Sequence, residues 1–588
     1  MKRTKGLKLG KQAMVWVLAL IAIMACVVLA ACTSGGGGAA ASSAAASGDA
    51  EASAAAEASA SAAEEAAASS AVEEAASASA EATPAGAAPE ADQFGVITAD
   101  KWADTYPNQY NTYLANAYNI PGYKGEYAEI TANNPDTTSK GDIQATADSG
   151  KANFLADDQY PEIKVIGKGY GYAKYYTEPG GHTFSIWSIE HNGRLGDVRG
   201  GTTGGILACY TCKTPQIHFD AENKGGAESW TIGELYPNAV AHDVELKVNE
   251  EGKELPGWKQ SAANGADYYT ENVSCANCHV NEDPGQMNII RQDWKRVLGK
   301  AWESNSLDIP QSAMVCGQCH CDYSMALSKT DTEYNNGEPT SPYEADTDGT
   351  LSNMTPEKAY QFYNDHDITD WVYASTGAKM LSIRHAEFEI YYVMEGGSAM
   401  RNTLNPATGE KFNCADCHMG KKTADDGTEY TSHTWTSPLD DPEISATCDS
   451  CHNGDISKYV KDIQAEIDGR NHELGMRYAD FIHKFEEKVA IMKVPEGGGD
   501  EALLLDEATA EANGIDADTL AKLQEIQREA CYYWNLPAAD NSEGAHNQKL
   551  YTMCLDKLEE LLNQGDEILG VTSSAADFEA WNAAQAQA

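Results

Sequence analysis

The pattern of hydrophobic and polar positions divides the chain into four stretches. Ala13 to Ala31 is uninterruptedly apolar, and residues 33–92 are almost wholly Ala, Ser, Gly and Glu. From Phe94 to His452 apolar and polar residues interleave, with few long periodic runs. After that, apolar residues recur every three or four positions over Ile456–Val494 and again over Asp516–Leu569. This spacing predicts long amphipathic helices near the C-terminus.

Two breaks interrupt the C-terminal pattern. Gly497-Gly498-Gly499 separates the two helical stretches, and residues 536–544 are irregular. We expect the long helices to pack on the preceding domain and to offer a dimer interface. Farther upstream, residues 160–176 alternate weakly and predict a short strand or two, ended by Pro179-Gly180-Gly181.

The N-terminus has the pattern of an export signal. Basic residues at positions 2, 3, 5, 8 and 11 precede the apolar run. Leu29-Ala30-Ala31-Cys32 resembles the bacterial lipobox, in which the cysteine is lipidated and becomes the mature N-terminus. The apolar run is also long enough for an uncleaved transmembrane anchor. Either alternative predicts an extracytoplasmic, membrane-tethered protein.

These patterns predict the domain organisation. We interpret residues 1–32 as a lipoprotein-type signal peptide. Residues 33–92 would be a disordered tether, because their composition cannot bury enough apolar surface to order a core. Residues 93–455 would form the main domain, and residues 456–588 the long-helix region.

Charge excludes some classes of partner. The chain has 42 Lys and Arg against 89 Asp and Glu, a formal charge of -47. This balance argues against binding to nucleic acid and against electrostatic docking on anionic lipid. An acidic surface suits an exported protein.

Ten of the fifteen cysteines belong to five Cys-x-x-Cys motifs. Four of these motifs are followed directly by histidine and the first by lysine. The motif cysteines are Cys209, Cys212, Cys275, Cys278, Cys316, Cys319, Cys414, Cys417, Cys448 and Cys451, and the residues that follow are Lys213, His279, His320, His418 and His452. The remaining cysteines, an odd number without regular spacing, do not indicate a disulfide framework; they are Cys26, Cys32, Cys321, Cys531 and Cys554.

Cys-x-x-Cys-His is the attachment signature of a c-type haem. Two thiols three positions apart lie on one helical turn, where they can form thioethers with the two vinyl groups, and the histidine then ligates the iron. A disulfide or zinc could explain a single Cys-x-x-Cys pair, but neither explains why histidine follows in four cases. The motifs therefore predict a multihaem cytochrome c, and the spacing patterns add a loop-rich core, long C-terminal helices and few short strands.

The motif that ends in Lys213 predicts a different kind of haem. A haem with histidine on both faces transfers electrons, whereas a reactive haem needs a vacant face. Lys213 is a candidate ligand for such a haem, since burial lowers the proton affinity of an amine and lets it ligate. The alternative is a solvent-facing lysine with another ligand on the iron.

One Cys-x-x-Cys-Lys followed by four Cys-x-x-Cys-His, in this order and with these gaps, resembles the pentahaem ammonia-forming cytochrome c nitrite reductases. The similarity runs from about Tyr160 to His546 and includes Ser312-Ala313-Met314-Val315 before the third motif. It implies a mainly α fold and five covalently attached haem c groups in a pentahaem catalytic domain. It also implies a homodimer, and a membrane quinol-oxidising cytochrome c as electron donor. The reaction would be the reduction of nitrite to ammonium by six electrons and eight protons. Hydroxylamine, nitric oxide and sulfite are alternative substrates.

Position by position, the resemblance implies three catalytic residues around the haem of Lys213. They are Arg194 to orient the anion, Tyr323 to stabilise intermediates and His385 to donate protons. Arg199 is the nearest alternative to Arg194.

The resemblance also implies distal haem ligands. His433 would ligate the second haem, His182 the third and His546 the fourth. For the fifth haem the expected stretch, from His385 to Cys414, contains no histidine. Met394 and Met400 lie near the expected place, and we favour Met400.

The sequence also departs from the family pattern at the calcium site. The family binds calcium beside the active site through an acidic residue, the adjacent tyrosine carbonyl and a Lys-x-Gln before the catalytic histidine. Asp322 and Tyr323 fit, but Ser382-Ile383-Arg384 replaces the last element. Arg384 could pair with Asp322 and fill the place of the cation, as in a calcium-independent branch of the family, so we expect no calcium.

An electron-transfer conduit without a substrate of its own is the alternative function. A conduit needs every iron to be six-coordinate. The lysine motif, together with Arg194, Tyr323 and His385, favours the enzyme.

Overall fold

The computed structural model describes residues 88–118, 160–170, 182–185, 211–223, 269, 271–291, 294–295, 309–322, 354–365, 367–383, 385–406, 408–435, 437–452, 454–540 and 542–585. All of them belong to one unit that runs from Ala80 to Ala588. The expected export signal, most of the tether and Cys32 lie outside the described residues. Among the described helices, none combines the length and the apolar character needed to cross a bilayer.

Helices are short before the fifth motif and long after it. In chain order they are η1 (Ala99–Trp102), α3 (Pro107–Tyr118), α5 (Ile163–Ile166), η5 (His182–Phe184), α9 (Gln216–Asn223), α13 (Cys275–Cys278), α16 (Gln311–Gly317), α19 (Pro356–Asp365), the π-helix η10 (Glu389–Val393), η11 (Met394–Gly396), η12 (Met400–Asn402), α20 (Cys414–His418), η13 (Pro438–Asp440), α21 (Pro442–His452), α22 (Ile456–Val489), α23 (Glu507–Ala512), α24 (Ala517–Ala538), α25 (Gln548–Leu569) and α26 (Ala575–Gln585).

Strands in the described residues form small antiparallel pairs. They are β1 (His279–Val280) with β2 (Asp283–Met287), β3 (Trp371–Val372) with β4 (Lys379–Met380), β5 (Lys421–Thr423) with β6 (Glu429–Thr431), and β7 (Ala490–Lys493) with β8 (Ala502–Leu505). The prediction of a mainly helical fold with few short strands is confirmed.

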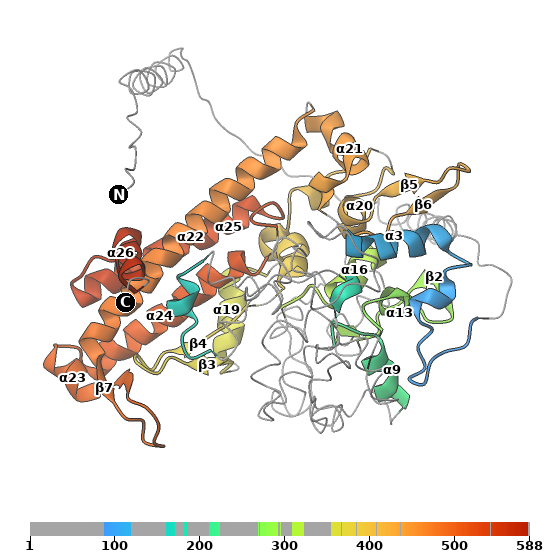
Figure 1. Ribbon diagram of the computed structural model, residues 1–588. Coiled ribbons are helices and arrows are strands. Elements are labelled where there is room, and N and C mark those ends of the chain that lie inside the picture. The colour runs from blue at the N-terminus through green and yellow to red at the C-terminus, as the bar shows by residue number, and fades with distance from the viewer. Residues whose placement is uncertain are drawn as a thin grey trace, which may run out of the picture. The chain divides into compact units, whose positions relative to one another are not determined.

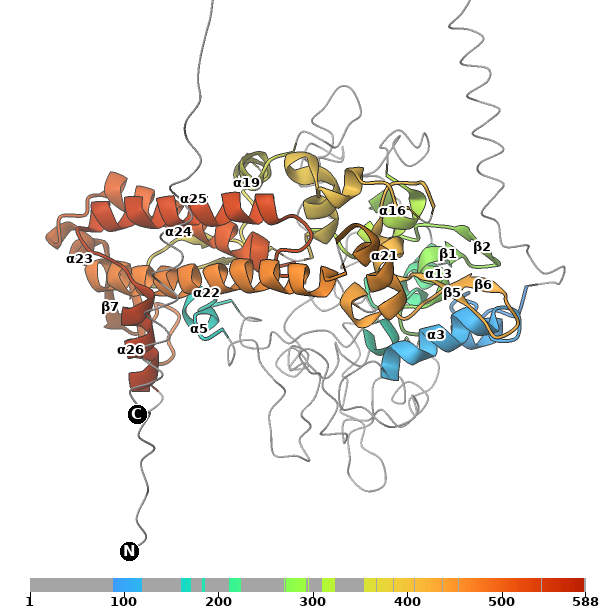
Figure 2. The same cartoon turned by 90° about the horizontal axis from the view of Figure 1, so that it is seen from above.

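The three long helices α22, α24 and α25 run side by side in both views (Figure 1, Figure 2) and contact one another. Each begins at a polar side chain that accepts a hydrogen bond from a backbone N–H of the first turn. Asp455 accepts from Lys458 at 3.1 Å, and Asp516 accepts from Thr519 at 2.8 Å. Asn547 does the same for α25. These caps satisfy N–H groups that have no partner within the helix, so the sequence itself fixes where each helix starts.

Close packing joins α22 to its neighbours. A Cβ atom on Gly565 of α25 would lie 2.5 Å from the ring of Phe481 in α22, so only glycine permits this approach. Tyr478 is fully buried on the same helix and donates its hydroxyl to the carbonyl of Gln527 in α24, at 2.6 Å. The helices thus form one core with a satisfied polar group inside it.

Two expectations about local structure differ from what the described residues show. The periodic run over 456–494 is helical only to Val489, and its last residues form β7. Asp506 donates its N–H to the Val489 carbonyl at 2.8 Å, which closes the hairpin around the glycines, and pairing with β8 then satisfies the backbone of β7. In the run over 160–176, residues Ile163–Ile166 form the helical turn α5, and residues 171–176 lie outside the described part.

An ion pair fastens the start of α5 to α22 and makes stability depend on pH. Glu162 is buried and accepts a hydrogen bond from Nδ1 of His472 at 2.8 Å. This bond raises the pKa of His472 above its ordinary value. The stabilisation is therefore complete below the unfolded pKa of about 6.5 and disappears as pH rises through the folded value.

We expect Glu162→Gln to lower the free energy of unfolding at about pH 6 by roughly 1 kcal/mol, a modest effect because His472 is one-third exposed and screened. At about pH 9 the variant should equal the parent, because neither form then carries the imidazolium. Urea unfolding at both pH values measures the difference. A loss independent of pH would contradict the assignment.

Candidate haem-binding and catalytic site

The residue directly before the second cysteine caps the helix in two of the motifs. In α13, Asn277 accepts a hydrogen bond from the N–H of Ser274 at 2.9 Å, and in α20 Asp416 accepts from the N–H of Asn413, also at 2.9 Å. Both are capping boxes, which fix the first turn and place the two cysteines on one side of it.

The third motif is tied to the second. The Gln318 side chain donates to the carbonyl of Asn277 at 2.7 Å. Beside it, a Cβ atom on Gly317 would lie 2.6 Å from the ring of Phe388 and 2.7 Å from that of Trp294. The glycine of this motif is therefore required by the packing around it.

The attachment cysteines of four of the five motifs lie next to one another in succession. Cys319 hydrogen bonds to the Cys212 thiol, which raises the pKa of Cys319. Cys316 likewise hydrogen bonds to Cys414, which raises the pKa of Cys316. Cys417 of the fourth motif lies near Cys448 of the fifth. Burial, and then this neighbouring thiol, raise the pKa of Cys417 to about 12. The first, third, fourth and fifth motifs are thus neighbours in that order.

Three expected ligand pairs are brought together. The ring centres are 6.3 Å apart for His279 and His433, 6.4 Å for His320 and His182, and 6.3 Å for His418 and His546. Two imidazoles bound on opposite sides of one metal, each through a bond of about 2 Å, have ring centres about 6 Å apart. The histidines therefore fit the two faces of a haem iron in all three places.

The surroundings of these histidines suit metal ligation. Burial lowers the pKa of His182 to about 3 and that of His433 to about 4, which keeps both imidazoles neutral, as a metal ligand must be. Nδ1 of His433 lies 3.0 Å from the carbonyl of Thr431, and Nδ1 of His546 lies 2.9 Å from a carboxylate oxygen of Asp540. These bonds leave Nε2 of each ring for a metal.

Trp435 was not singled out by the sequence, although it is only two residues from His433. Its ring centre lies 4.3 Å from that of His182 and 5.5 Å from that of His433. The indole thus contacts one expected ligand of the third haem and one of the second. Its backbone has a positive φ of 47°, a strained conformation for a bulky residue.

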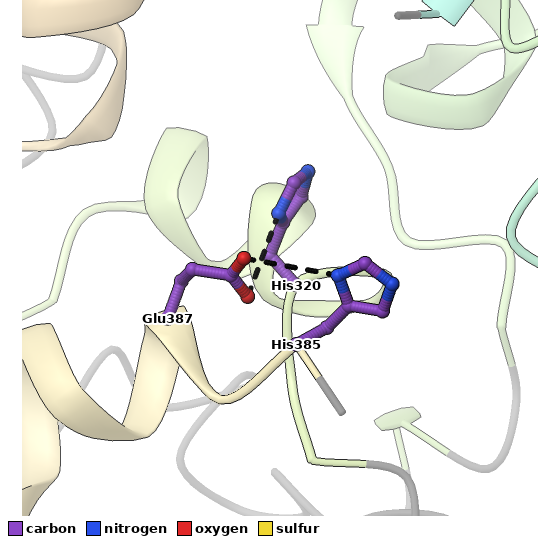
Figure 3. A group of neighbouring side chains, drawn as sticks. All are labelled: His320, His385 and Glu387. Carbon is purple, nitrogen blue, oxygen red and sulfur yellow. Dashed lines mark ion pairs between the residues drawn. The ribbon is translucent and has the colours of Figure 1, made fainter. Parts of the chain in front are cut away.

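His385 is positioned by a strained backbone and a buried carboxylate. Its φ is +56°, in the left-handed region. Figure 3 shows Glu387 facing both His385 and His320, and each Nδ1 is 3.7 Å from one of its two oxygens. Burial alone would raise the pKa of Glu387, but the two imidazoles hold it well below its usual value. The carboxylate is therefore ionised and links the expected proton donor to an expected ligand of the third haem.

Donor atoms of His320, His385 and Glu387 all lie within 4.8 Å of one another. By composition, such a group could hold a metal ion directly. The ring centre of His320 lies 6.4 Å from that of His182 and 6.1 Å from that of His385, and we interpret the group as the edge of the haem site. Sequence reasoning missed Glu387, although it stands only two residues beyond His385.

Several expected site residues lie outside the described part: Cys209, Arg194, its alternative Arg199, Tyr323 and Arg384. Lys213 is described, and its backbone carbonyl accepts the hydroxyl of Ser185 at 2.7 Å. Asp322 is buried, and its N–H donates to Glu389 at 2.9 Å. Met394 is buried, whereas Met400 is partly exposed at the start of η12.

The fold and this site define a multihaem c-type cytochrome with covalently attached haem. A family model described as cytochrome c552 matches residues 98–576. The chain belongs to the cytochrome c552 family.

Curated relatives include the cytochrome c nitrite reductase subunit NrfA of Nitratidesulfovibrio vulgaris, 27% identical over 406 residues, which are 66% of this chain and 64% of the relative. The cytochrome c-552 of Haemophilus influenzae is 24% identical over 466 residues, or 76% of this chain and 68% of the relative. The chain thus spans less than two thirds of the first relative. The solved structure of a cytochrome c nitrite reductase from Desulfovibrio desulfuricans matches 83% of this chain and 88% of its own, with a TM-score of 0.52 and 20% identity, and shows the same fold.

Proposed function

We propose that this chain reduces nitrite to ammonium at the haem attached through Cys209 and Cys212 and ligated by Lys213. One observation carries the proposal: among five motifs in a cytochrome c552 family chain, one ends in lysine. The name of the nitrite reductase relative supports the same activity.

The reaction consumes nitrite, eight protons and six electrons and yields ammonium and two waters. A haem with one open face, held by Cys209, Cys212 and Lys213, would supply the electrons for the reduction. The protein must then hold a small anion and deliver protons to its oxygens. Arg194 orients the anion through its paired N–H groups, and Tyr323 donates a hydrogen bond to it. His385 delivers protons, with Glu387 keeping its Nδ1 directed away from the substrate side.

Four further haems feed this site, making five in all. The order of the attachment cysteines, with those of the third motif beside Cys212, supports entry of electrons into the Lys213 haem from the third haem. The paired histidines support two-faced ligation of the second, third and fourth haems, as electron transfer requires.

An anaerobic assay with a reduced viologen dye and nitrite tests the proposal. We expect six electrons to leave the dye for each ammonium formed. Oxidation of the dye without ammonium would favour the electron conduit instead. Hydroxylamine and sulfite, supplied in place of nitrite, test the alternative substrates.

Calcium is not required in our proposal, in which Arg384 would pair with Asp322, a buried residue, and supply the positive charge in place of the cation. By contrast, the structure of the Desulfovibrio desulfuricans enzyme has two calcium sites. Extended dialysis against a chelator should leave nitrite reduction within twofold of its starting rate. Loss of activity on chelation, with recovery on adding calcium, would refute the proposal.

Met400 is proposed as the distal ligand of the fifth haem, with Met394 as the alternative. A methionine ligand would raise the potential of that haem above those of the bis-histidine haems. Redox titration of Met400→Ala, followed haem by haem, should lower one high midpoint; no change would eliminate Met400.

The protein is further proposed to be a homodimer, tethered outside the cytoplasm and reduced by a membrane quinol-oxidising cytochrome c. We further propose four segments: a lipoprotein-type signal peptide (1–32), a disordered tether (33–92), a pentahaem catalytic domain (93–455) and a long-helix region (456–588). Mass spectrometry of the N-terminal peptide would show a lipidated Cys32, or an intact residue 13–31 segment if the anchor is uncleaved. Sedimentation tests the dimer, and quinol-driven nitrite reduction in membranes tests the donor.

A further inference from the structure

Asp540 is a fully buried carboxylate just beyond the end of α24. Its side chain is 0% exposed, and one oxygen lies 2.9 Å from Nδ1 of His546. Among the described residues, His546 is its ion-pair partner. A buried carboxylate without a compensating charge is costly. The negative charge of Asp540 must therefore be balanced by the His546 imidazole and by the metal that this imidazole would ligate.

Further donors fix the carboxylate. The Ser542 hydroxyl donates to it at 2.6 Å, and the Ser542 N–H donates at 3.0 Å. The buried hydroxyl of Tyr551, in α25, donates to the same oxygen as the Ser542 hydroxyl. The loop closes where the N–H of His546 donates back to Ser542 Oγ at 2.9 Å. Both the imidazole and the carboxylate are therefore held in one orientation, with Nε2 of His546 free to face His418.

Three of the other expected ligands have weaker partners. His433 meets a neutral backbone carbonyl, that of Thr431. Nδ1 of His182 is buried and has no hydrogen-bond partner among the described residues. Glu387 faces His320, but at 3.7 Å, beyond hydrogen-bonding distance, and it is shared with His385. A direct hydrogen bond to a buried carboxylate thus distinguishes His546 from His433, His182 and His320.

We propose that Asp540 is a positioning residue that makes His546 a strongly electron-donating ligand and lowers the reduction potential of the fourth haem below those of the second and third. The inference rests on the proposed ligation of that haem by His418 and His546. A carboxylate that accepts the Nδ1 proton of a ligating histidine fixes its tautomer and raises its basicity. A more basic ligand stabilises the oxidised iron, since that form carries more positive charge.

The low potential of the fourth haem affects electron flow, because this haem lies between two others. Cys414 contacts Cys316 of the third motif, and Cys417 neighbours Cys448 of the fifth. The fourth haem therefore lies between the third and the fifth along the relay. Electrons would cross it without accumulating there.

Redox titration of the haem-loaded full-length protein, followed haem by haem by electron paramagnetic resonance, tests the proposal. Asp540→Asn keeps the shape but removes the charge. We expect the ratio of reduced to oxidised fourth haem at a fixed potential to rise about tenfold, or 59 mV for a one-electron couple, with the other midpoints unchanged.

Tyr551→Phe is the second variant, and we expect it to shift the midpoint potential of the fourth haem in the opposite direction. It removes a donor from the carboxylate, which leaves more of the charge for His546, so the same midpoint should fall by a smaller amount. A merely structural role would not produce opposite shifts. Unchanged midpoints, or shifts in one direction in both variants, would overturn the proposal.

The ligation itself is tested separately by His546→Ala. Appearance of one new high-spin haem is expected from loss of the distal ligand. If no haem changes its spin state, the assigned ligand is wrong and the proposed haem arrangement fails. If a high-spin haem appears but Asp540→Asn leaves every midpoint unchanged, only the inference about Asp540 fails.

Discussion

His385→Asn should reduce turnover with nitrite by about 100- to 10,000-fold, the range that general acid catalysis contributes. The imidazole lies beside ionised Glu387, with Nδ1 3.7 Å from the carboxylate. An amide at this position can still hydrogen bond to nitrite but cannot deliver protons. The loss should therefore appear mainly in kcat, with a smaller change in KM.

Steady-state ammonium formation measures this effect, and the absorption spectrum confirms that all haems are loaded. His483→Gln is the matched control. That residue is a histidine of α22 whose ring lies 4.4 Å from Trp581 of α26, and it has no assigned role in the reaction. We expect its turnover to equal that of the parent. A His385 variant that retains more than a tenth of parental kcat would exclude His385 as the proton donor.

Much of the site could be predicted because its residues sit in local motifs or match a family by position. The Cys-x-x-Cys-His frame predicts the attachment turns, and the resemblance assigned His182 to the third haem, more than a hundred residues before His320. The observed spacing of 6.4 Å between their ring centres fits that assignment. Helix starts were also readable, since Asp455, Asp516 and Asn547 have the side chains that cap helices.

Other parts could not be predicted, because they depend on contacts between distant segments. Nothing local marks Glu387 as the neighbour of His320, or Asp540 as the partner of His546, since acidic residues are common throughout this chain. The β7–β8 hairpin was missed for a related reason. Its apolar residues continue the helical period, and only the pairing of β7 with β8 decides for strand.

Arg528 also makes contacts between distant segments, and these contacts hold the segment that precedes His385. It lies in α24, is 5% exposed, and donates to the side chain of Asn364 and to the carbonyls of Ile368 and Lys379, each at 2.8 Å. Ile368 lies three residues before β3, and Lys379 is the first residue of β4, six residues before His385. The guanidinium thus fixes the segment that leads into the expected catalytic histidine.

We expect Arg528→Met to lower the free energy of unfolding by about 3 kcal/mol, because it leaves buried carbonyls without a donor. Well below the unfolding temperature it should also slow nitrite turnover, since the approach to His385 loosens. Arg477→Met is the matched control. That arginine is 17% exposed, pairs with buried Asp566 at 3.0 Å and lies away from the site, so its loss should destabilise the fold and leave turnover unchanged. Urea unfolding and ammonium formation measured on both variants separate the two roles. Equal turnover in the two variants would mean that Arg528 stabilises the fold without positioning His385.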